Sequence, residues 1–242
     1  FAGLGATSAV LMLVFKDTIT GLVAGVRLTS NDMLHKGDWI TVKSVDANGI
    51  VEDMSLTTVK VRNFDNTIVT ISPITLVNGS FQNWIGMQKS GGRRAKRVVY
   101  FDFRSVRLVD ETLKRNLLAK HFATEDSFKL KESLQKAIDK DIQEGKDIED
   151  LKNPAAFAPT NLQLYRKFME KYLRQRPEVN TDLTLMVRHM EATQCGLPIE
   201  FYFFIKDKVW VNYEHILADI MEHAYALANE FGLKIYEQYP EQ

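Results

Sequence analysis

The chain opens with apolar and small residues and keeps a helical period for about its first thirty positions. No residue from 1 to 15 is charged, and the charged pair Lys16 and Asp17 follows. After this pair, apolar residues recur at three- and four-residue steps: Ile19, Leu22, Val23 and Val26. This spacing predicts one helix over residues 2–30, bent between Asp17 and Gly21. At about 1.5 Å per residue, the uncharged run covers about 22 Å, which is shorter than the roughly 30 Å hydrocarbon core of a membrane. The run is either a buried helix or a transmembrane helix that lacks its start, and we expect the second.

Beyond residue 36 the period changes from that of a helix to that of a strand. Short runs of β-branched residues alternate with polar ones at residues 39–42, 49–53, 57–62 and 67–71. Turn-forming residues separate them at 46–49 and 63–66. Four or five short strands in this space predict a small β-domain or partial barrel.

The remainder of the chain alternates between the two periods. Gly91-Gly92 and a basic cluster mark a predicted junction, after which strands are expected at 98–103, 184–190 and 199–205. Helices are expected at 108–122, 127–143, from Thr160 to Pro177, and 215–231, with Gly145 and Gly232 just past two helix ends. Residues 145–159 are expected to form a loop. Together these elements predict an α+β domain with an antiparallel sheet and helices on one face.

Charge and cysteine content narrow the class of protein. The 31 Lys and Arg residues balance 31 Asp and Glu residues, which gives no electrostatic reason to expect a nucleic-acid partner. Cys195 is the only cysteine, so the chain has no internal disulfide and a reducing compartment fits best. No signal peptide is predicted.

The sequence shows no arrangement of residues that predicts a catalytic or metal-binding site. The five histidines include no pair four residues apart with a glutamate between them. The glycines at positions 3 and 5 follow no strand and lack the third glycine of a phosphate-binding loop. We therefore expect no enzyme activity, no metal site and no cofactor.

A basic cluster next to the predicted β-domain admits two interpretations. Its members are Arg93, Arg94, Lys96 and Arg97. It could bind an anion, a lipid or RNA, or it could be a solvated domain junction. Single-strand binders normally interleave stacking aromatic residues, which this cluster lacks, so the junction is favoured.

Several motifs, in order, resemble the small-conductance mechanosensitive channel (MscS) family. Over residues 8–84, a helix ending in Leu22-Val23-Ala24-Gly25-Val26 precedes Gly37-Asp38-Trp39-Ile40, Gly49-Ile50-Val51, the stretch Arg62-Asn63-Phe64-Asp65, and Val69-Thr70-Ile71. The longer carboxyl-terminal region, with Gly196-Leu197-Pro198-Ile199-Glu200 and Gly232-Leu233, is similar to the YbdG-like miniconductance branch.

The resemblance implies a membrane channel with three parts. A pore-lining helix with its bent continuation would span residues 1–35, an Sm-like β-domain 36–90, and a ferredoxin-like α+β domain, which is cytoplasmic, 91–242. It further implies a homoheptamer in the bacterial inner membrane, opened by tension during osmotic stress. Its expected partners are the lipid bilayer, further copies of the chain, and permeating ions and small solutes, but not nucleic acid.

The sequence departs from the family pattern at two places. The pore helix of better-known members alternates alanine and glycine, whereas residues 10–15 are bulky here. The usual Pro-Asn after the last strand is replaced by Ser72-Pro73. The first departure bears on the pore radius and on the ease of gating.

Candidate gate residues follow from helical geometry and from the resemblance together. Ala9 and Leu13 share one stripe with Lys16 or Asp17, and the family's sealing positions align with Ala9 and Leu13. Lys16 and Asp17 are about 100° apart around the helix, so their charges offset each other and weak ion selectivity is expected. Leu13 could instead simply pack between helices.

Gly21 and Gly25 are one helical turn apart and predict close packing or a bend. They could also be two tolerated glycines in an ordinary helix.

The alternative function is a soluble, ring-forming binding module of Sm-like type, in which the first helix is an oligomer contact.

Overall fold

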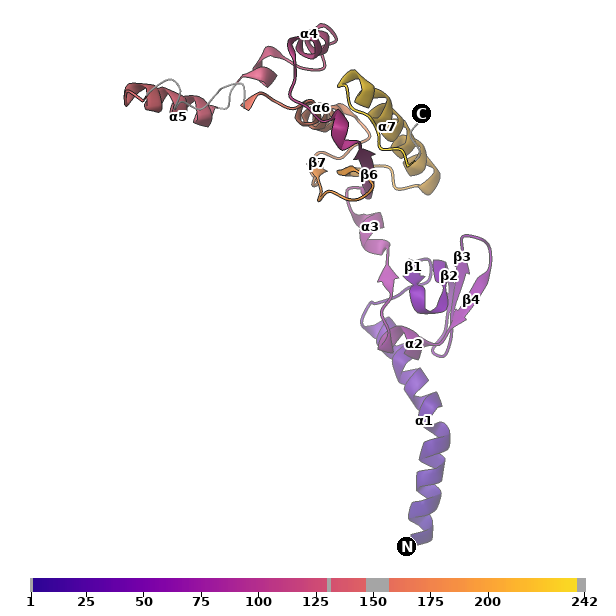
Figure 1. Ribbon diagram of the computed structural model, residues 1–242. Coiled ribbons are helices and arrows are strands. Elements are labelled where there is room, and N and C mark those ends of the chain that lie inside the picture. Colours follow the sequence, from indigo (N-terminus) through magenta and orange to yellow (C-terminus); the bar gives the residue numbers. More distant parts are fainter. Residues whose placement is uncertain (1, 130–131, 147–156, 239–242) are drawn as a thin grey trace. The chain divides into compact units, whose positions relative to one another are not determined.

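The computed structural model describes residues 2–129, 132–146 and 157–238, with residues 2–11 described by their backbone alone. The chain divides into two compact units, Phe1–Ser90 and Gly91–Gln242. Figure 1 labels elements of both units, with β5 (Gln82–Asn83) and β8 (Leu197–Ile205) left unlabelled.

The first unit joins a long helix to a small antiparallel sheet. Helix α1 covers Ala2–Ser30 and is followed by β1 (Trp39–Val42), a 3-10 turn (Lys43–Val45), β2 (Ala47–Met54), β3 (Val59–Asn63) and β4 (Ile68–Ile71). The short elements α2 (Pro73–Asn78), β5 (Gln82–Asn83) and α3 (Ile85–Lys89) complete the unit. The strands form one sheet in the order β4-β3-β2-β1-β5.

Alternation of side chains builds the core of this sheet. Along β2 and β3, buried and exposed residues alternate, because successive side chains of a strand point to opposite faces. The buried set extends beyond the strands to α1, the loop after it and α2: Leu28, Leu34, Ile40, Val42, Ala47, Val51, Val59, Val61, Ile71 and Leu76. The end of α1 is therefore part of the β-domain core.

The second unit carries a three-stranded antiparallel sheet in the order β6-β8-β7. Its strands are β6 (Arg93–Phe101), β7 (Met186–His189) and β8 (Leu197–Ile205). Its α-helices are α4 (Glu111–Ala119), α5 (Glu132–Gln143), α6 (Asn161–Gln175) and α7 (Trp210–Glu230), and 3-10 turns cover Phe103–Ser105 and Glu125–Phe128.

Two helices cover one face of this sheet. Val99 and Phe201 of the strands belong to the same buried cluster as Tyr165 of α6 and Ile220 of α7. The Tyr165 hydroxyl donates a hydrogen bond of 2.6 Å to the Ala224 carbonyl, which ties α6 to α7. The predicted arrangement, an antiparallel sheet with helices on one face, is confirmed.

Most predicted elements are present, with corrections at their ends. The helix over 2–30 and the four strands of the β-domain are confirmed, and Thr160 caps α6 by accepting a hydrogen bond from the Gln163 amide. The prediction missed α2, β5 and α3, which have six, two and five residues. Helix α7 begins at Trp210, five residues before the predicted start at 215. Residues 147–156 of the predicted loop lie outside the described residues.

The basic cluster was placed wrongly before its strand. Strand β6 begins at Arg93, so all four cations lie inside it. The predicted helix over 127–143 corresponds to a 3-10 turn and to α5, with residues 130–131 between them outside the described part.

Candidate functional site

Helix α1 exposes large apolar side chains along most of its described length. The side chains of Met12 and Leu13 are 71% and 75% exposed, and residues further along remain open: Val14, Phe15, Ile19, Leu22, Val23 and Val26. A soluble domain normally covers such a surface, so this helix is suited to contact another apolar phase or further protein. None of the helices in the described part of the chain is both long and apolar enough to cross a membrane.

The candidate gate residues lie in the amino-terminal half of α1, which Figure 1 shows extending from the β-domain toward the N-terminus. Leu13, Lys16 and Asp17 are exposed. The backbone of Ala9 belongs to α1, and its side chain lies outside the described part. The Thr20 hydroxyl donates a hydrogen bond of 2.7 Å to the Lys16 carbonyl, one turn earlier in the same helix. Whether these residues line a pore stays a prediction.

The two glycines of α1 differ in their surroundings. A Cβ atom added at Gly21 would meet nothing within 4 Å. A Cβ atom added at Gly25 would lie 2.2 Å from the carbonyl oxygen of Leu56 in the β2–β3 turn. Gly25 therefore permits close packing of α1 on the β-domain of its own chain, a partner that the sequence pattern did not identify.

Helix α1 ends in a Schellman motif that turns the chain into the β-domain. The Met33 amide donates to the Leu28 carbonyl (3.1 Å) and the Asp32 amide donates to the Thr29 carbonyl (3.3 Å). Asp32 has φ of +57°, in the left-handed region usually taken by glycine. The side chain of His35 contacts it, with 3.1 Å between Nε2 and the Asp32 carboxylate.

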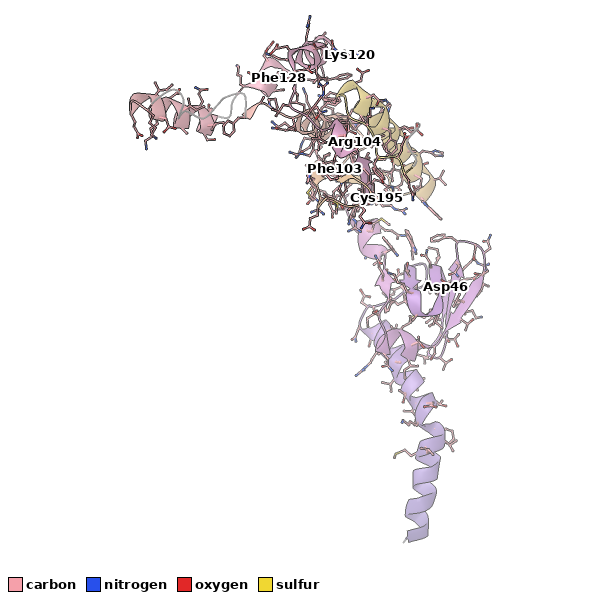
Figure 2. The ribbon with its side chains drawn as sticks, in the orientation of Figure 1. Asp46, Phe103, Arg104, Lys120, Phe128 and Cys195 are labelled. Atoms are coloured by element: carbon pink, nitrogen blue, oxygen red, sulfur yellow. The ribbon has the colours of Figure 1, made fainter. Side chains whose placement is uncertain are left out.

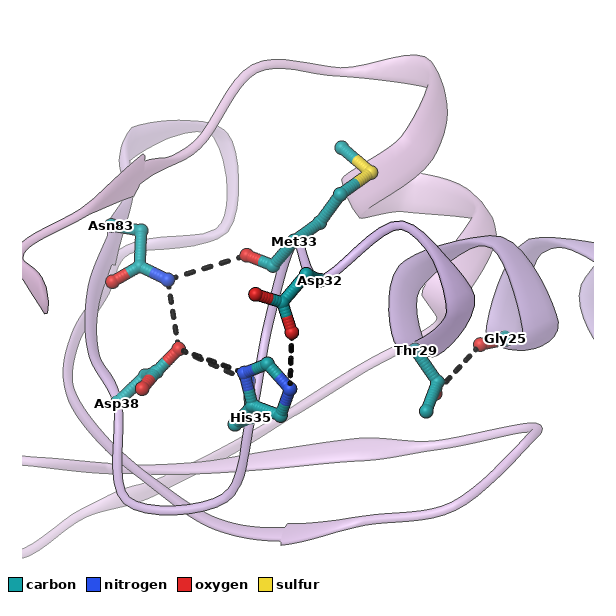
Figure 3. A network of polar contacts seen from close by, with 7 residues as sticks. All are labelled: Gly25, Thr29, Asp32, Met33, His35, Asp38 and Asn83. Carbon is teal, nitrogen blue, oxygen red and sulfur yellow. Dashed lines mark hydrogen bonds and ion pairs between the residues drawn. The ribbon is translucent and has the colours of Figure 1, made fainter.

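Asp38 organises the loop between α1 and β1 (Figure 3). Its carboxylate is buried and accepts hydrogen bonds from the His35 amide at 3.0 Å and from Asn83 Nδ2 at 2.8 Å. Asn83 Nδ2 also donates to the Met33 carbonyl at 3.2 Å. Because Asn83 belongs to β5, these hydrogen bonds attach the loop after α1 to β5. Gly37, the residue before Asp38, has φ of +93°, which is in the left-handed region that favours glycine.

Gly49 has a packing role inside the sheet instead of a turn role. It lies in β2 opposite Asn63, and a Cβ atom there would be 1.9 Å from the Arg62 carbonyl oxygen. The tight turn before it is made by Asp46, which has φ of +52° (Figure 2).

The basic cluster forms no single patch on the second unit. Because residues of a strand alternate between faces, Arg93 and Arg97 lie on the side of α7, where Arg93 stacks on the Tyr213 ring at 4.3 Å. Lys96 lies on the opposite side, with its ammonium 3.2 Å from the Glu200 carboxylate. These pairings favour a structural role for the cluster.

The described residues include no group of three or more His, Cys, Asp or Glu side chains that could hold a metal ion. Cys195 is exposed at the surface of the second unit (Figure 2).

Comparison with known sequences identifies the β-domain. Residues 17–86 match the family model described as mechanosensitive ion channel, beta-domain. The small-conductance mechanosensitive channel MscMJ of Methanocaldococcus jannaschii is 34% identical over 82 residues, which cover 34% of this chain and 23% of that protein. The large-conductance mechanosensitive channel MscMJLR of the same organism is 29% identical over 126 residues, which cover 52% and 34%. The chain thus spans about a quarter to a third of the length of these relatives.

Solved structures share the fold over almost the whole chain. The crystal structure of Helicobacter pylori MscS in its closed state has a TM-score of 0.60 at 14% identity, covering 100% of this chain and 71% of that one. The cryo-EM structure of Arabidopsis thaliana MSL1 has a TM-score of 0.61 at 10% identity, covering 98% and 64%. At this identity the likeness concerns the fold alone.

The expectation that the chain is not an enzyme is confirmed by relatives that are named as channels. The YbdG-like branch stays a prediction. The family match covers residues 17–86, so it contains the second half of α1 and most of the β-domain, and this part of the chain is similar to the β-domain of the MscS family of mechanosensitive channels.

Proposed function

We propose that the chain is a subunit of a channel that membrane tension opens, and that the channel passes ions and small solutes. The observation that carries this proposal is the long exposed apolar surface of α1 on a helix anchored in a mechanosensitive-channel β-domain. In the proposed channel, α1 lines the pore with one side and contacts lipid or neighbouring copies with the others.

The proposed mechanism uses the size and apolar character of side chains on α1. Tension favours the state that occupies the larger membrane area, and a ring of apolar side chains closes a narrow pore by expelling water. Leu13 is the bulkiest apolar member of the stripe that also contains Ala9. A small outward movement of α1 then admits water and ions.

We further propose that the chain assembles with itself into a ring of seven. One short helix per chain cannot enclose a pore. Within the described part of the chain, the β-domain sheet ends in two edges, β4 and β5, that have no further strand beside them. Pairing the β4 edge of one copy with the β5 edge of the next is a head-to-tail contact, which closes into a ring when its rotation fits.

The proposed location is the bacterial inner membrane, with the β-domain and the second unit in the cytoplasm. The proposed role is release of solutes after osmotic downshock. The alternative, a soluble Sm-like ring, buries the apolar surface of α1 in contacts between copies and has no role in downshock.

Survival of downshock separates these proposals. Bacteria that lack their own mechanosensitive channels would express the full-length protein and be diluted abruptly into water. The proposed channel restores survival, and the exposed-site variant Cys195→Ser restores it equally. No rescue by a protein that is present in the membrane would contradict the channel proposal, and recovery of the protein in the soluble fraction would support the alternative.

A further inference from the structure

We infer that the β2–β3 turn, residues 55–58, fixes the position of α1 by packing against Gly25. The part of α1 from Gly25 to its end at Ser30 then moves together with the β-domain as one body. The inference rests on the proposed channel function. It makes Gly25 a positioning residue for gating and assigns no such role to Gly21, although the two glycines are equivalent in the sequence pattern.

The first support is the closeness of two backbones at Gly25. A methyl group on Gly25 would lie 2.2 Å from the carbonyl oxygen of Leu56, 2.8 Å from its carbonyl carbon and 2.9 Å from its Cα atom. All three are backbone atoms, so no side-chain rotation could make room. Any larger residue at position 25 must therefore displace either the helix or the turn.

The second support is the construction of the turn, which holds its shape by its own hydrogen bonds. The Ser55 amide donates to the Thr58 carbonyl at 2.8 Å, and the Thr58 amide donates to the Ser55 hydroxyl oxygen at 3.0 Å. Ser55 Oγ also donates to the Thr58 carbonyl at 3.2 Å. A turn closed in this way offers α1 a firm surface and yields little when the helix presses on it.

The third support is where the contact lies along α1. Ala24 and Leu28 are 4% and 0% exposed, whereas Leu22 and Val23 are 43% and 50% exposed. The buried stripe thus starts about where Gly25 meets the turn, and Gly21, one turn earlier, has open space around it. None of residues 12–23 is buried, so the packing that would hold α1 on the β-domain begins at Ala24.

Two alanine substitutions give a matched test, because both replace a glycine of the same helix by a better helix former. Gly25→Ala must separate α1 from the turn. Gly21→Ala meets nothing and serves as the control. Ser55→Ala removes the hydroxyl that closes the turn without touching α1, so it weakens the same contact even if Gly25→Ala fails to fold.

The contact is measured by the distance between spin labels on Val26 and Thr57, both exposed, in the full-length Cys195→Ser protein. Labelled chains would be diluted with unlabelled ones so that each ring carries one pair. We expect one narrow distance distribution in the parent and in Gly21→Ala, and a broadened or displaced distribution in Gly25→Ala and Ser55→Ala.

The same proteins would be recorded under graded suction. Because a loosened helix moves without carrying the β-domain, Gly25→Ala and Ser55→Ala should open at lower tension than the parent, and Gly21→Ala should not. The inference is overturned if Gly25→Ala and Ser55→Ala match Gly21→Ala in both readouts. A parent that shows the narrow distance but no current under tension would instead contradict the proposed function and leave the contact intact.

Discussion

At the scale of single residues, Asp38 shows how one buried carboxylate can join two segments that are far apart in the sequence. It holds the loop after α1 through the His35 amide and holds β5 through Asn83, which in turn reaches the Met33 carbonyl. The sequence signals this residue only as part of a family motif. Its partner Asn83 is forty-five positions away and could not be identified from spacing.

Replacing Asp38 with alanine should destabilise the β-domain by about 1–3 kcal/mol, because buried donors lose their acceptor. Asp38→Asn keeps one acceptor oxygen and should cost less. Trp39 and Trp84 stack at 4.6 Å, so tryptophan fluorescence during urea unfolding, in a Trp210→Phe background, reports on this unit. Equal midpoints for the parent and for Asp38→Ala would show that the loop is held by other contacts.

Leu13 belongs to the proposed seal, and its side chain is 75% exposed in the single chain. Leu13→Ser places a hydroxyl ring where expulsion of water closes the pore, so the channel should open at lower tension. Leu13→Met, which keeps a similar apolar volume, is the control and should gate near the parent tension. A gating tension that stays the same in Leu13→Ser would remove this residue from the seal.

At the scale of elements, the helices and strands that could be predicted from the sequence were those long enough to show a regular pattern of apolar and polar residues. Strands β1 to β4 could be predicted because β-branched residues alternate with polar ones. Elements as short as α2 and β5 carry too few residues for any period, although Ser72-Pro73 is a typical helix start. Strand β6 includes the basic cluster, whose members Arg93, Lys96 and Arg97 find partners on one face of the sheet or the other. Spacing alone does not reveal these partners. Likewise, only tertiary contact distinguishes Gly25 from Gly21.

The sheet of the second unit is joined by a charge cluster across its three strands. Glu200 of β8 is fully buried between Arg188 of β7, at 2.6 Å, and Lys96 of β6, at 3.2 Å. Burial by itself raises the pKa of this carboxyl group, but the hydrogen bonds and charges of Arg188 and Lys96 outweigh it and hold the pKa of Glu200 below its usual value.

Glu200→Gln should therefore lower the free energy of unfolding by about 1–3 kcal/mol near neutral pH, a modest loss because both cations are half exposed. A lowered carboxyl pKa contributes stability above the unfolded-state value of about 4.3 and loses it as the pH falls through the folded-state value. The parent and the variant should thus converge in acid.

The control for this prediction is Glu214→Gln, which removes a carboxylate that is 47% exposed and 3.8 Å from Arg97. It should change the free energy of unfolding by less than about 0.5 kcal/mol. Urea unfolding at neutral and acidic pH measures both variants. A loss for Glu200→Gln that persists unchanged in acid would show that packing, not charge, is responsible.

At the scale of the whole molecule, an apolar helix, a β-domain and an α+β unit are arranged along one chain with no net charge. The division into residues 1–35, 36–90 and 91–242 remains a prediction, and the packing of Leu28 into the β-domain core ties the first two parts together. In the proposed channel, the pore, the number of subunits and the tension sensitivity are properties of an assembly of chains, not of one chain.

Native mass spectrometry of the full-length protein released from detergent should give a single species of seven chains, because the two sheet edges of each copy need neighbours. Charged substitutions at Ile68 of the β4 edge, 49% exposed in the single chain, should shift the species toward monomers. A monomer or dimer as the largest species of the parent would contradict the proposed ring.

The central claim, that membrane tension opens this protein, is tested most directly by recording the purified full-length protein in lipid patches under graded suction. We predict that no channel opens in unstressed patches and that discrete openings appear, and become more frequent, as suction rises. Their tension midpoint should decrease in Leu13→Ser. Patches that contain the assembled protein but stay silent up to the tension at which the lipid ruptures would contradict the account.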